Sequence, residues 1–262
     1  MNIGFFGLGA MGYPMAAYLA RKSFAIAPQD LDAGTVERFC AEFGRADFEP
    51  RAAELVVTCV TDESAIESLL LGPGGLLRSA RPRQLFIDHT TTSPEFSRRA
   101  ARMAGGKNAK FVDAPMSGGV AGARKGTLSF FVGGEPSAVQ LASPVLACYG
   151  ARITPLGPPG AGQTGKLANQ IAIAGIVRGL QEASALARAT GLDLNALYDA
   201  LGAGTARSDQ LDQHRDRLAD ATRGFGDNFN WLAKDLDLAL GEARLHGIEL
   251  PASALIRSTL AR

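Results

Sequence analysis

The chain opens with the stretch Met1-Asn2-Ile3-Gly4-Phe5-Phe6-Gly7-Leu8-Gly9-Ala10-Met11-Gly12. Its first half is a short apolar run, long enough for one buried strand. Its second half has the pattern G-x-G-x-x-G, and Pro14 then begins an apolar segment typical of a helix, where a missing N–H costs little in the first turn. Strand, glycine-rich turn and helix in this order predict a dinucleotide-binding site, whereas the glycine pattern alone would also fit a plain strand-to-helix turn.

Each glycine of this motif has its own part in such a site. Gly7 permits the tight turn, Gly9 lets the backbone approach a pyrophosphate, and Gly12 lets the helix pack closely on the strand. The helix N-terminus also offers N–H groups and a positive dipole to the phosphates. We therefore expect a dinucleotide cofactor to contact the whole loop, namely Gly7, Leu8, Gly9, Ala10, Met11 and Gly12.

Asp30 follows the next expected strand, Phe24-Ala25-Ile26-Ala27, which we expect Pro28 to end. It lies close to the spacing of about 20 residues at which an acidic residue binds the adenosine ribose of NAD. Its charge would repel a 2′-phosphate, and the next residue, Leu31, is not an arginine. The sequence therefore favours NAD over NADP, with Asp30 and Leu31 at the ribose. The alternative is that Asp30 is a turn residue or a helix N-cap.

Short strand-like runs then alternate with helical stretches. Strands are expected at Leu55–Val60, Leu85–Asp88, Lys110–Asp113, Gly126–Gly134 and Arg152–Pro155. This alternation predicts an α/β fold, with an N-terminal Rossmann domain whose doubly wound sheet is mostly parallel.

Polar residues follow two of these strands, at the sheet edge where ligands bind in open α/β folds. We expect Val60, Thr61 and Thr91 to contact the cofactor. For the two threonines, helix capping is an equally good interpretation. His89 lies in the same region and is more simply interpreted as a packed residue.

The glycine and proline cluster from Gly157 to Gly162 gives the best domain boundary. We predict an NAD-binding domain at 1–158 and an all-helical substrate and dimerisation domain at 159–262. A helix from Gly165 to Thr190, ended by Gly191, is apolar nearly all round in its middle, which predicts burial on every side. It would pack on the first domain or on a partner chain, so we expect a homodimer or homotetramer. Trp231–Leu245 is the last clear helix.

Lys166, Asn169 and Gln170 lie on one face of the long helix, at spacings of i, i+3 and i+4. Small and apolar residues surround Lys166. A partly buried lysine beside a cationic nicotinamide would give up its proton readily, as acid/base catalysis requires. A lysine whose ammonium reaches water is the alternative.

Two further places are candidates for ligand contacts. The loop Ser117-Gly118-Gly119 presents consecutive N–H groups and a hydroxyl, which suit a substrate carboxylate, although an ordinary hairpin or crossover loop is equally possible. Lys234 begins the last helix, where it opposes the helix dipole, so it is placed either for a ligand or simply in solvent.

Bulk composition excludes other classes of protein. Of 262 residues, 27 are Lys or Arg and 26 are Asp or Glu, so the net charge of +1 argues against a nucleic-acid partner. The apolar stretch Ile171–Val177 is too short to cross a membrane. The 3 cysteines are widely spaced, which fits a reducing compartment and no metal site. Because the chain begins directly in a strand, we expect no targeting segment and a cytoplasmic protein.

Four stretches together resemble the β-hydroxyacid dehydrogenases, the family of 3-hydroxyisobutyrate dehydrogenase and tartronate semialdehyde reductase. They cover nearly all of the chain and comprise Gly7–Ala16, Asp113–Gly119 with its continuation to Gly134, Gly160–Gln170, and Gly224-Phe225 to Leu236. The resemblance implies an NAD(H)-dependent oxidoreductase that interconverts a small 3-hydroxy acid and its semialdehyde or keto acid.

The resemblance also implies roles for matching residues. Lys166 would be the general acid/base, and Ser117, Gly118 and Gly119 would hold the substrate carboxylate. Asn169 or Gln170 would orient the substrate. Lys234 would close over cofactor and substrate.

The chain departs from the family pattern in places. Tyr18, Ser23, Val60-Thr61 and Gln170 replace the usual Asn, Gly, Leu-Pro and second Asn. It also ends soon after Pro251, where members usually continue, so either the protein is short or its end is missing. Two rival functions are an imine reductase on the same scaffold, which Lys166 disfavours, and a catalytically silent NAD-binding module.

Overall fold

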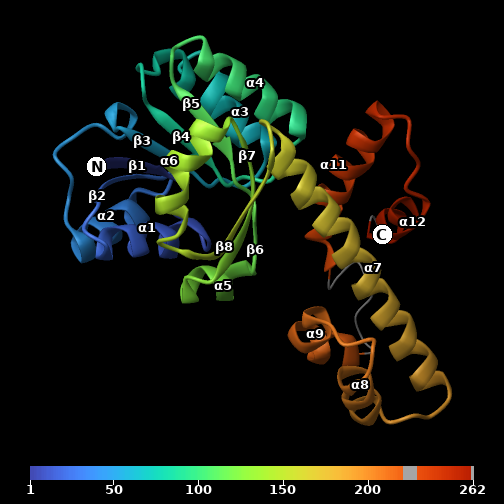
Figure 1. Ribbon diagram of the computed structural model, residues 1–262. Helices are drawn as coiled ribbons and strands as arrows, with labels where there is room; N and C mark the ends of the chain where they lie inside the picture. The colour runs from blue at the N-terminus through green and yellow to red at the C-terminus, as the bar shows by residue number, and fades with distance from the viewer. Residues whose placement is uncertain (221–228, 261–262) are drawn as a thin grey trace. The chain divides into compact units, whose positions relative to one another are not determined.

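The computed structural model describes residues 1–220 and 229–260 (Figure 1). The chain forms two compact units, Met1–Lys166 and Leu167–Arg262. The long helix α7 (Ala161–Ala189) begins in the first unit and continues into the second. The expected domain boundary after residue 158 therefore lies just before this helix and stays a prediction.

Strands and helices alternate through the first unit. In chain order its elements are β1 (Asn2–Phe6), α1 (Gly12–Arg21), β2 (Ala25–Gln29), α2 (Ala33–Phe43), η1 (Pro50–Ala52), β3 (Leu55–Thr58), α3 (Glu63–Leu71), η2 (Leu76–Ser79), β4 (Leu85–Asp88), α4 (Pro94–Gly105), β5 (Lys110–Asp113), β6 (Met116–Ser117), α5 (Gly119–Lys125), β7 (Leu128–Gly134), α6 (Pro136–Leu146) and β8 (Gly150–Gly157).

One sheet joins all of these strands. Its order is β2-β1-β3-β4-β5-β7-β6, with β8 also paired to β7. The first five strands of this order are parallel to one another, β7 is antiparallel to β5 and β6, and β8 is parallel to β7. This confirms the doubly wound, mostly parallel sheet.

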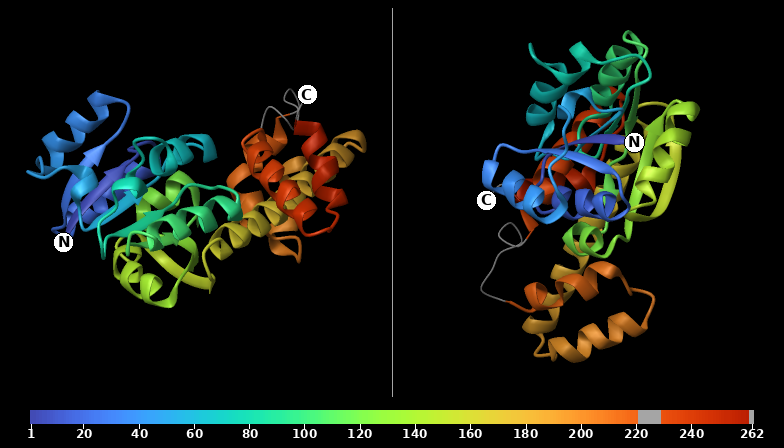
Figure 2. Two further views of the ribbon diagram at one scale, coloured as in Figure 1. Left: turned by 90° about the horizontal axis from the view of Figure 1, so that it is seen from above. Right: turned by 90° about the vertical axis from the view of Figure 1, so that its left-hand side faces the viewer.

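Side chains of the central strands alternate between two hydrophobic cores, because neighbouring residues of a strand point to opposite faces. In β3, Leu55 and Val57 join a core with residues of α1, α2 and α6, while Val56 joins a second core with residues of α3 and α4. Both faces of the sheet are therefore covered by helices, as Figure 2 shows.

Pro28 does not end the second strand as expected. β2 continues to Gln29, and Pro28 is the register partner of Phe5 in β1. The reason is the position of β2 at the edge of the sheet, where one side of the strand needs no ladder hydrogen bond and a missing N–H is tolerated.

The second unit is helical in its described part. It contains most of α7, then α8 (Leu194–Ala203), α9 (Asp209–Ala219), α11 (Leu232–Leu245) and α12 (Pro251–Leu260). Asp193 caps α8 by accepting from the N–H of Ala196, and Gly191 has a φ of +75° just after α7, both as expected. The Gly224-Phe225-Gly226 break lies outside the described residues.

One expectation for the second unit is wrong. α12 follows α11, and Pro251 starts it, because proline is well tolerated in a first helical turn. The middle of α7 is only partly covered in the single chain: Ala174 and Val177 are buried, whereas Ile176 is 41% exposed, so its burial against a partner chain stays a prediction. Its apolar surface exceeds what this one chain covers.

Candidate active site

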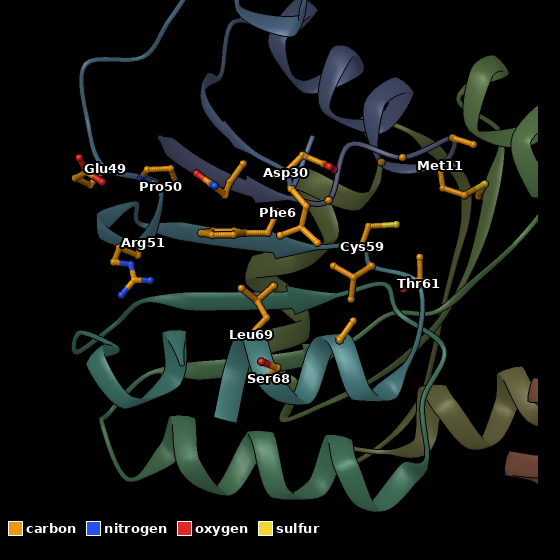
Figure 3. Close-up of a pocket in the computed structure, with 18 residues that line it drawn as sticks. Phe6, Met11, Asp30, Glu49, Pro50, Arg51, Cys59, Thr61, Ser68 and Leu69 are labelled. Atoms are coloured by element: carbon orange, nitrogen blue, oxygen red, sulfur yellow. The ribbon is translucent and has the colours of Figure 1, made fainter. Parts of the chain in front are cut away.

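A pocket of about 1010 Å³ lies against the glycine-rich loop of the first unit. Figure 3 shows Met11 and Asp30 on one side of it, Ser68 and Leu69 reaching in from α3 on the other, and Cys59 and Thr61 at the end of β3. Of the residues predicted to bind the cofactor, the lining includes Gly7, Gly9, Ala10, Met11, Gly12, Asp30, Leu31, Val60 and Thr61.

The three motif glycines have distinct surroundings. Gly7 has a φ of +95°, and a Cβ on Gly12 would collide with the carbonyl oxygen of Gly7. Gly9 differs, since no described atom other than those of Gly9 and its two chain neighbours lies within 4 Å of the place its Cβ would take. Gly7 and Gly12 thus serve the fold, while the space at Gly9 fits the close approach of a pyrophosphate. The pocket therefore fits a dinucleotide cofactor.

Asp30 lines this pocket and braces the glycine loop. Its Oδ2 accepts a hydrogen bond from the N–H of Leu8 at 2.5 Å, and its Oδ1 accepts from the N–H of Asp32 at 2.9 Å. The N-cap of α2 is Asp32, whose carboxylate accepts from the N–H of Gly34, so the N-cap role considered for Asp30 is wrong. Leu8 itself is buried and is not among the residues that line the pocket.

Arg51, on η1, also lines the pocket, although no sequence pattern singles it out. It is distant from Asp30 and Leu31 in the chain, so the spacing between the glycine motif and Asp30 does not predict it. The pocket wall therefore carries a cation as well as the Asp30 carboxylate.

The capping interpretation of the two threonines is wrong, because a neighbouring residue caps each helix. Asp62 caps α3 by accepting from the N–H of Ala65, and Ser93 caps α4 by accepting from the N–H of Phe96. Thr61 lines the pocket, whereas Thr91 is not among the lining residues.

A buried polar row ends the three central strands. Thr58, Asp88 and Asp113 are register partners at the last positions of β3, β4 and β5. Asp88 accepts from the Thr58 hydroxyl at 2.9 Å and from the N–H of Thr90 at 3.0 Å. Burial raises the pKa of Asp88 to about 7 and also raises the pKa of Asp113, while backbone hydrogen bonds oppose both shifts. Sequence pattern predicts Thr58 within a strand and Asp88 and Asp113 at strand ends, and it indicates no role for the side chain of any of them.

His89 is a packed residue, as interpreted. It is 2% exposed, and burial lowers its pKa to about 4. Its Nδ1 lies 2.7 Å from the carbonyl oxygen of Ala114, so Nδ1 carries the proton, and Nε2 accepts from the hydroxyl of Tyr149 at 3.0 Å. Both nitrogens are engaged in the fold.

The predicted carboxylate loop lies between β6 and α5. Ser117 ends β6, Gly118 has a φ of +120°, and Gly119 has a φ of +58° at the start of α5. The loop is therefore a strand-to-helix turn that needs both glycines, and it is not a simple hairpin. Tyr18 braces the far end of α5, since its hydroxyl donates to the carbonyl oxygen of Arg124 at 3.1 Å.

Lys166 lies in the second turn of α7 and is 9% exposed, which does not fit an ammonium held out in water. Asn169 and Gln170 follow on the same helix, in the second unit. There the Asn169 amide donates to Gln170 Oε1 at 3.0 Å, and Gln170 Nε2 donates to Asp235 Oδ2 at 2.6 Å. Asp235, which sequence reasoning missed, thus holds Gln170.

Lys234 is close to the same carboxylate. Its Nζ lies 3.4 Å from Asp235 Oδ1, and its side chain is 43% exposed. This placement is intermediate between the two interpretations of Lys234, since the ammonium has an acidic neighbour and remains accessible.

Two family models, one after the other, together match nearly the whole chain. One, described as the NAD binding domain of 6-phosphogluconate dehydrogenase, matches residues 2–157, and one described as NAD-binding of NADP-dependent 3-hydroxyisobutyrate dehydrogenase matches residues 160–262. The chain belongs to the β-hydroxyacid dehydrogenase family. It is thus an oxidoreductase that uses a nicotinamide cofactor and acts on the CH–OH group of hydroxy acids.

Named relatives agree with this family. 3-Hydroxyisobutyrate dehydrogenase of Pseudomonas aeruginosa is 35% identical over 98% of this chain and 90% of its own length. 2-Hydroxy-3-oxopropionate reductase of Escherichia coli is 34% identical over 97% and 88%. The structure of Mycobacterium tuberculosis 3-hydroxyisobutyrate dehydrogenase with L-serine has a TM-score of 0.84 and 29% identity, covering 99% of this chain and 92% of that one. No helix in the described part of the chain is long and apolar enough to cross a membrane.

Proposed function

We propose that this member of the β-hydroxyacid dehydrogenase family interconverts a small 3-hydroxy acid and its semialdehyde or keto acid, with Lys166 as the general acid/base and NAD as the preferred cofactor. The observation that carries the proposal is the burial of Lys166: it is 9% exposed, and it belongs to the unit that also holds the dinucleotide pocket. A lysine with so little access to water can exchange its proton with a substrate bound beside it, as general acid/base catalysis requires.

The chemistry divides between cofactor and protein. When bound, the nicotinamide takes a hydride from the hydroxyl carbon or returns it. The neutral amine of Lys166 accepts the hydroxyl proton during oxidation, and its ammonium returns the proton during reduction. The cofactor thus accounts for the transferred hydride, and Lys166 accounts for the transferred proton.

The remaining predicted residues bind and orient. The loop Ser117-Gly118-Gly119 holds the substrate carboxylate through its N–H groups and hydroxyl. Asn169 orients the substrate and is itself held by the contact between Gln170 and Asp235. Lys234 supplies positive charge toward the cofactor and substrate.

The preference for NAD rests on Asp30. Both of its oxygens already accept backbone N–H groups, so the carboxylate is fixed in place at the pocket wall and keeps lone pairs for ribose hydroxyls. A 2′-phosphate there would meet a fixed negative charge. We further propose that the enzyme is a cytoplasmic homodimer or homotetramer that acts on small carboxylates.

A fluorescence titration with NADH, followed in the same cuvette by small semialdehydes, tests the function together with a parallel assay of NAD with small 3-hydroxy acids. Binding with turnover of one compound supports it. Binding without turnover of any compound supports the rival of a catalytically silent NAD-binding module. Absence of binding contradicts the assignment of the pocket.

A further inference from the structure

The first turn of α7 is capped by a side chain from another part of the chain. The first N–H groups of a helix have no acceptor within it, and Gly160, just before α7, has no side chain to provide one. Asp113, the last residue of β5, supplies the missing acceptors. Its Oδ1 accepts from the N–H of Gly160 at 2.9 Å, and its Oδ2 accepts from the N–H of Gln163 at 3.0 Å. The start of α7 is thus fixed to the strand that leads into the Ser117 loop.

The space for this carboxylate is formed by two glycines. A Cβ on Gly133 would lie 2.6 Å from Oδ1 of Asp113, and a Cβ on Gly162 would lie 2.8 Å from Oδ2. Real Cβ atoms do not approach so closely, so any larger residue at either position would displace the carboxylate or the helix. Asp113 is fully buried here.

Gln163 makes a second connection from the same turn. It is fully buried, its Oε1 accepts from the N–H of Thr92 at 3.0 Å, and its Nε2 donates to the carbonyl oxygen of Thr90 at 2.7 Å. The hydroxyl of Thr90 in turn accepts from the N–H of Val60, which lines the dinucleotide pocket. Hydrogen bonds therefore run from α7 to the pocket wall.

We propose that Asp113 and Gln163 are positioning residues that fix Lys166 relative to the cofactor pocket and the Ser117 loop. Lys166 follows Gln163 by three residues, so any shift of the first turn moves its backbone directly. This inference rests on the proposed role of Lys166. It adds that the reaction geometry depends on two buried side chains that touch neither substrate nor cofactor.

Two variants test the proposal. In Asp113→Asn, the amide presents an NH₂ group to one of the two N–H donors, so one hydrogen bond and the charge are lost. Gln163→Met keeps the length of the side chain but loses the contacts with Thr90 and Thr92. For both, we expect kcat to fall at least about tenfold, with NADH affinity unchanged, because small misplacements of a catalytic group are costly.

Asp88→Asn is the matched control. Asp88 is the register partner of Asp113 and is equally buried, but within the described part of the chain its hydrogen bonds go to Thr58 and Thr90 and none goes to α7. We expect this variant to keep its kcat. A fall in kcat as large as that of Asp113→Asn would overturn the proposal, since loss of any buried carboxylate would then have the same effect.

A readout without turnover separates this inference from the proposed function. Trace acylation of lysines, followed by mass spectrometry across a pH series, reports the accessibility and basicity of Lys166 even if no substrate is found. In Asp113→Asn and Gln163→Met the profile of Lys166 should change several-fold while that of Lys22 stays constant. If these variants lower the melting temperature but leave the reactivity of Lys166 unchanged, the two side chains only stabilise the start of α7, and the proposal is wrong.

Discussion

Asp88 and Asp113 lie opposite each other on the neighbouring parallel strands β4 and β5, and both carboxyl groups are buried. Their hydrogen bonds differ. Asp113 accepts N–H groups from the start of α7, whereas Oδ2 of Asp88 has no hydrogen-bond partner among the described residues. The nearby Asp113 also raises the pKa of Asp88, after the larger effect of burial. The pair is therefore expected to carry one proton, on Asp88.

Replacement of Asp88 by Asn should remove a pH dependence of stability. The pKa of Asp88 rises from 3.8 to about 7 on folding, so its protonation stabilises the fold fully below pH 3.8, and this stabilisation is lost as the pH rises through 7. The unfolding free energy of the wild type, relative to Asp88→Asn, should thus decrease between these pH values. Urea unfolding of both proteins at a series of pH values measures the difference.

His89 adds a second pH dependence of stability, which the comparison of the two proteins removes. Its lowered pKa, about 4, makes its own contribution increase with pH through the same range, since burial favours the neutral ring. That contribution is present in both proteins and cancels in the difference. A difference that does not vary with pH would show that Asp88 does not bind a proton on folding.

Gly9 and Gly12 should respond differently to alanine. Gly9→Ala has room for its methyl group in the fold, so stability should be retained while the pyrophosphate is kept away and NADH affinity falls. Gly12→Ala places the methyl group against the carbonyl oxygen of Gly7 and the ring of Phe5, so stability should fall as well. Thermal unfolding and NADH titration of both variants give the comparison. Unimpaired NADH binding by Gly9→Ala would contradict the assignment.

The parts that were predictable from the sequence are those that local pattern determines. The glycine motif, the strands and the cap at Asp193 each depend on a few neighbouring residues. Tertiary position decided the rest. Pro28 stays in a strand because that strand is at the sheet edge, a fact that no local pattern contains.

Contacts between distant parts of the chain likewise could not be predicted from local sequence pattern. Arg51 at the pocket, Asp113 at the start of α7 and Asp235 against Gln170 each join segments far apart in the sequence. The helix caps considered at Asp30, Thr61 and Thr91 failed for a different reason. Several polar residues precede each helix, and the cap is set by the position of the first turn, which sequence pattern locates only within a few residues.

Leu31→Arg should improve the use of NADP. Leu31 lines the pocket and is fully exposed, so an arginine there costs the fold little and offers a bidentate partner to a 2′-phosphate. The ratio of kcat/KM for NADP to that for NAD should rise. Arg51→Leu is the companion variant, because it removes the cation already at the pocket. An unchanged ratio in Leu31→Arg would place the ribose away from Asp30.

The exposed apolar face of α7 should be covered by a second copy of the chain. Ile176 and Leu186 are 41% and 67% exposed on this helix. Light scattering should therefore show a dimer or larger assembly, and Ile176→Glu should weaken it, because a buried unpaired charge is costly at an interface. Gln181→Glu, a polar-to-charged change on the same helix, is a control for added charge alone. A monomeric wild type would contradict the prediction.

Lys166→Ala should abolish turnover and leave NADH binding nearly intact. Loss of a general acid/base typically costs a factor of about 10² to 10⁴ in rate, whereas the pocket that binds the dinucleotide is lined by other residues. Lys166→Met is the better matched variant, since it keeps an apolar chain of similar length in a buried position. NADH titration and steady-state kinetics of both variants give the two quantities. Wild-type turnover in either variant would exclude Lys166 as the proton carrier, whereas loss of NADH binding together with turnover would point to a collapsed site.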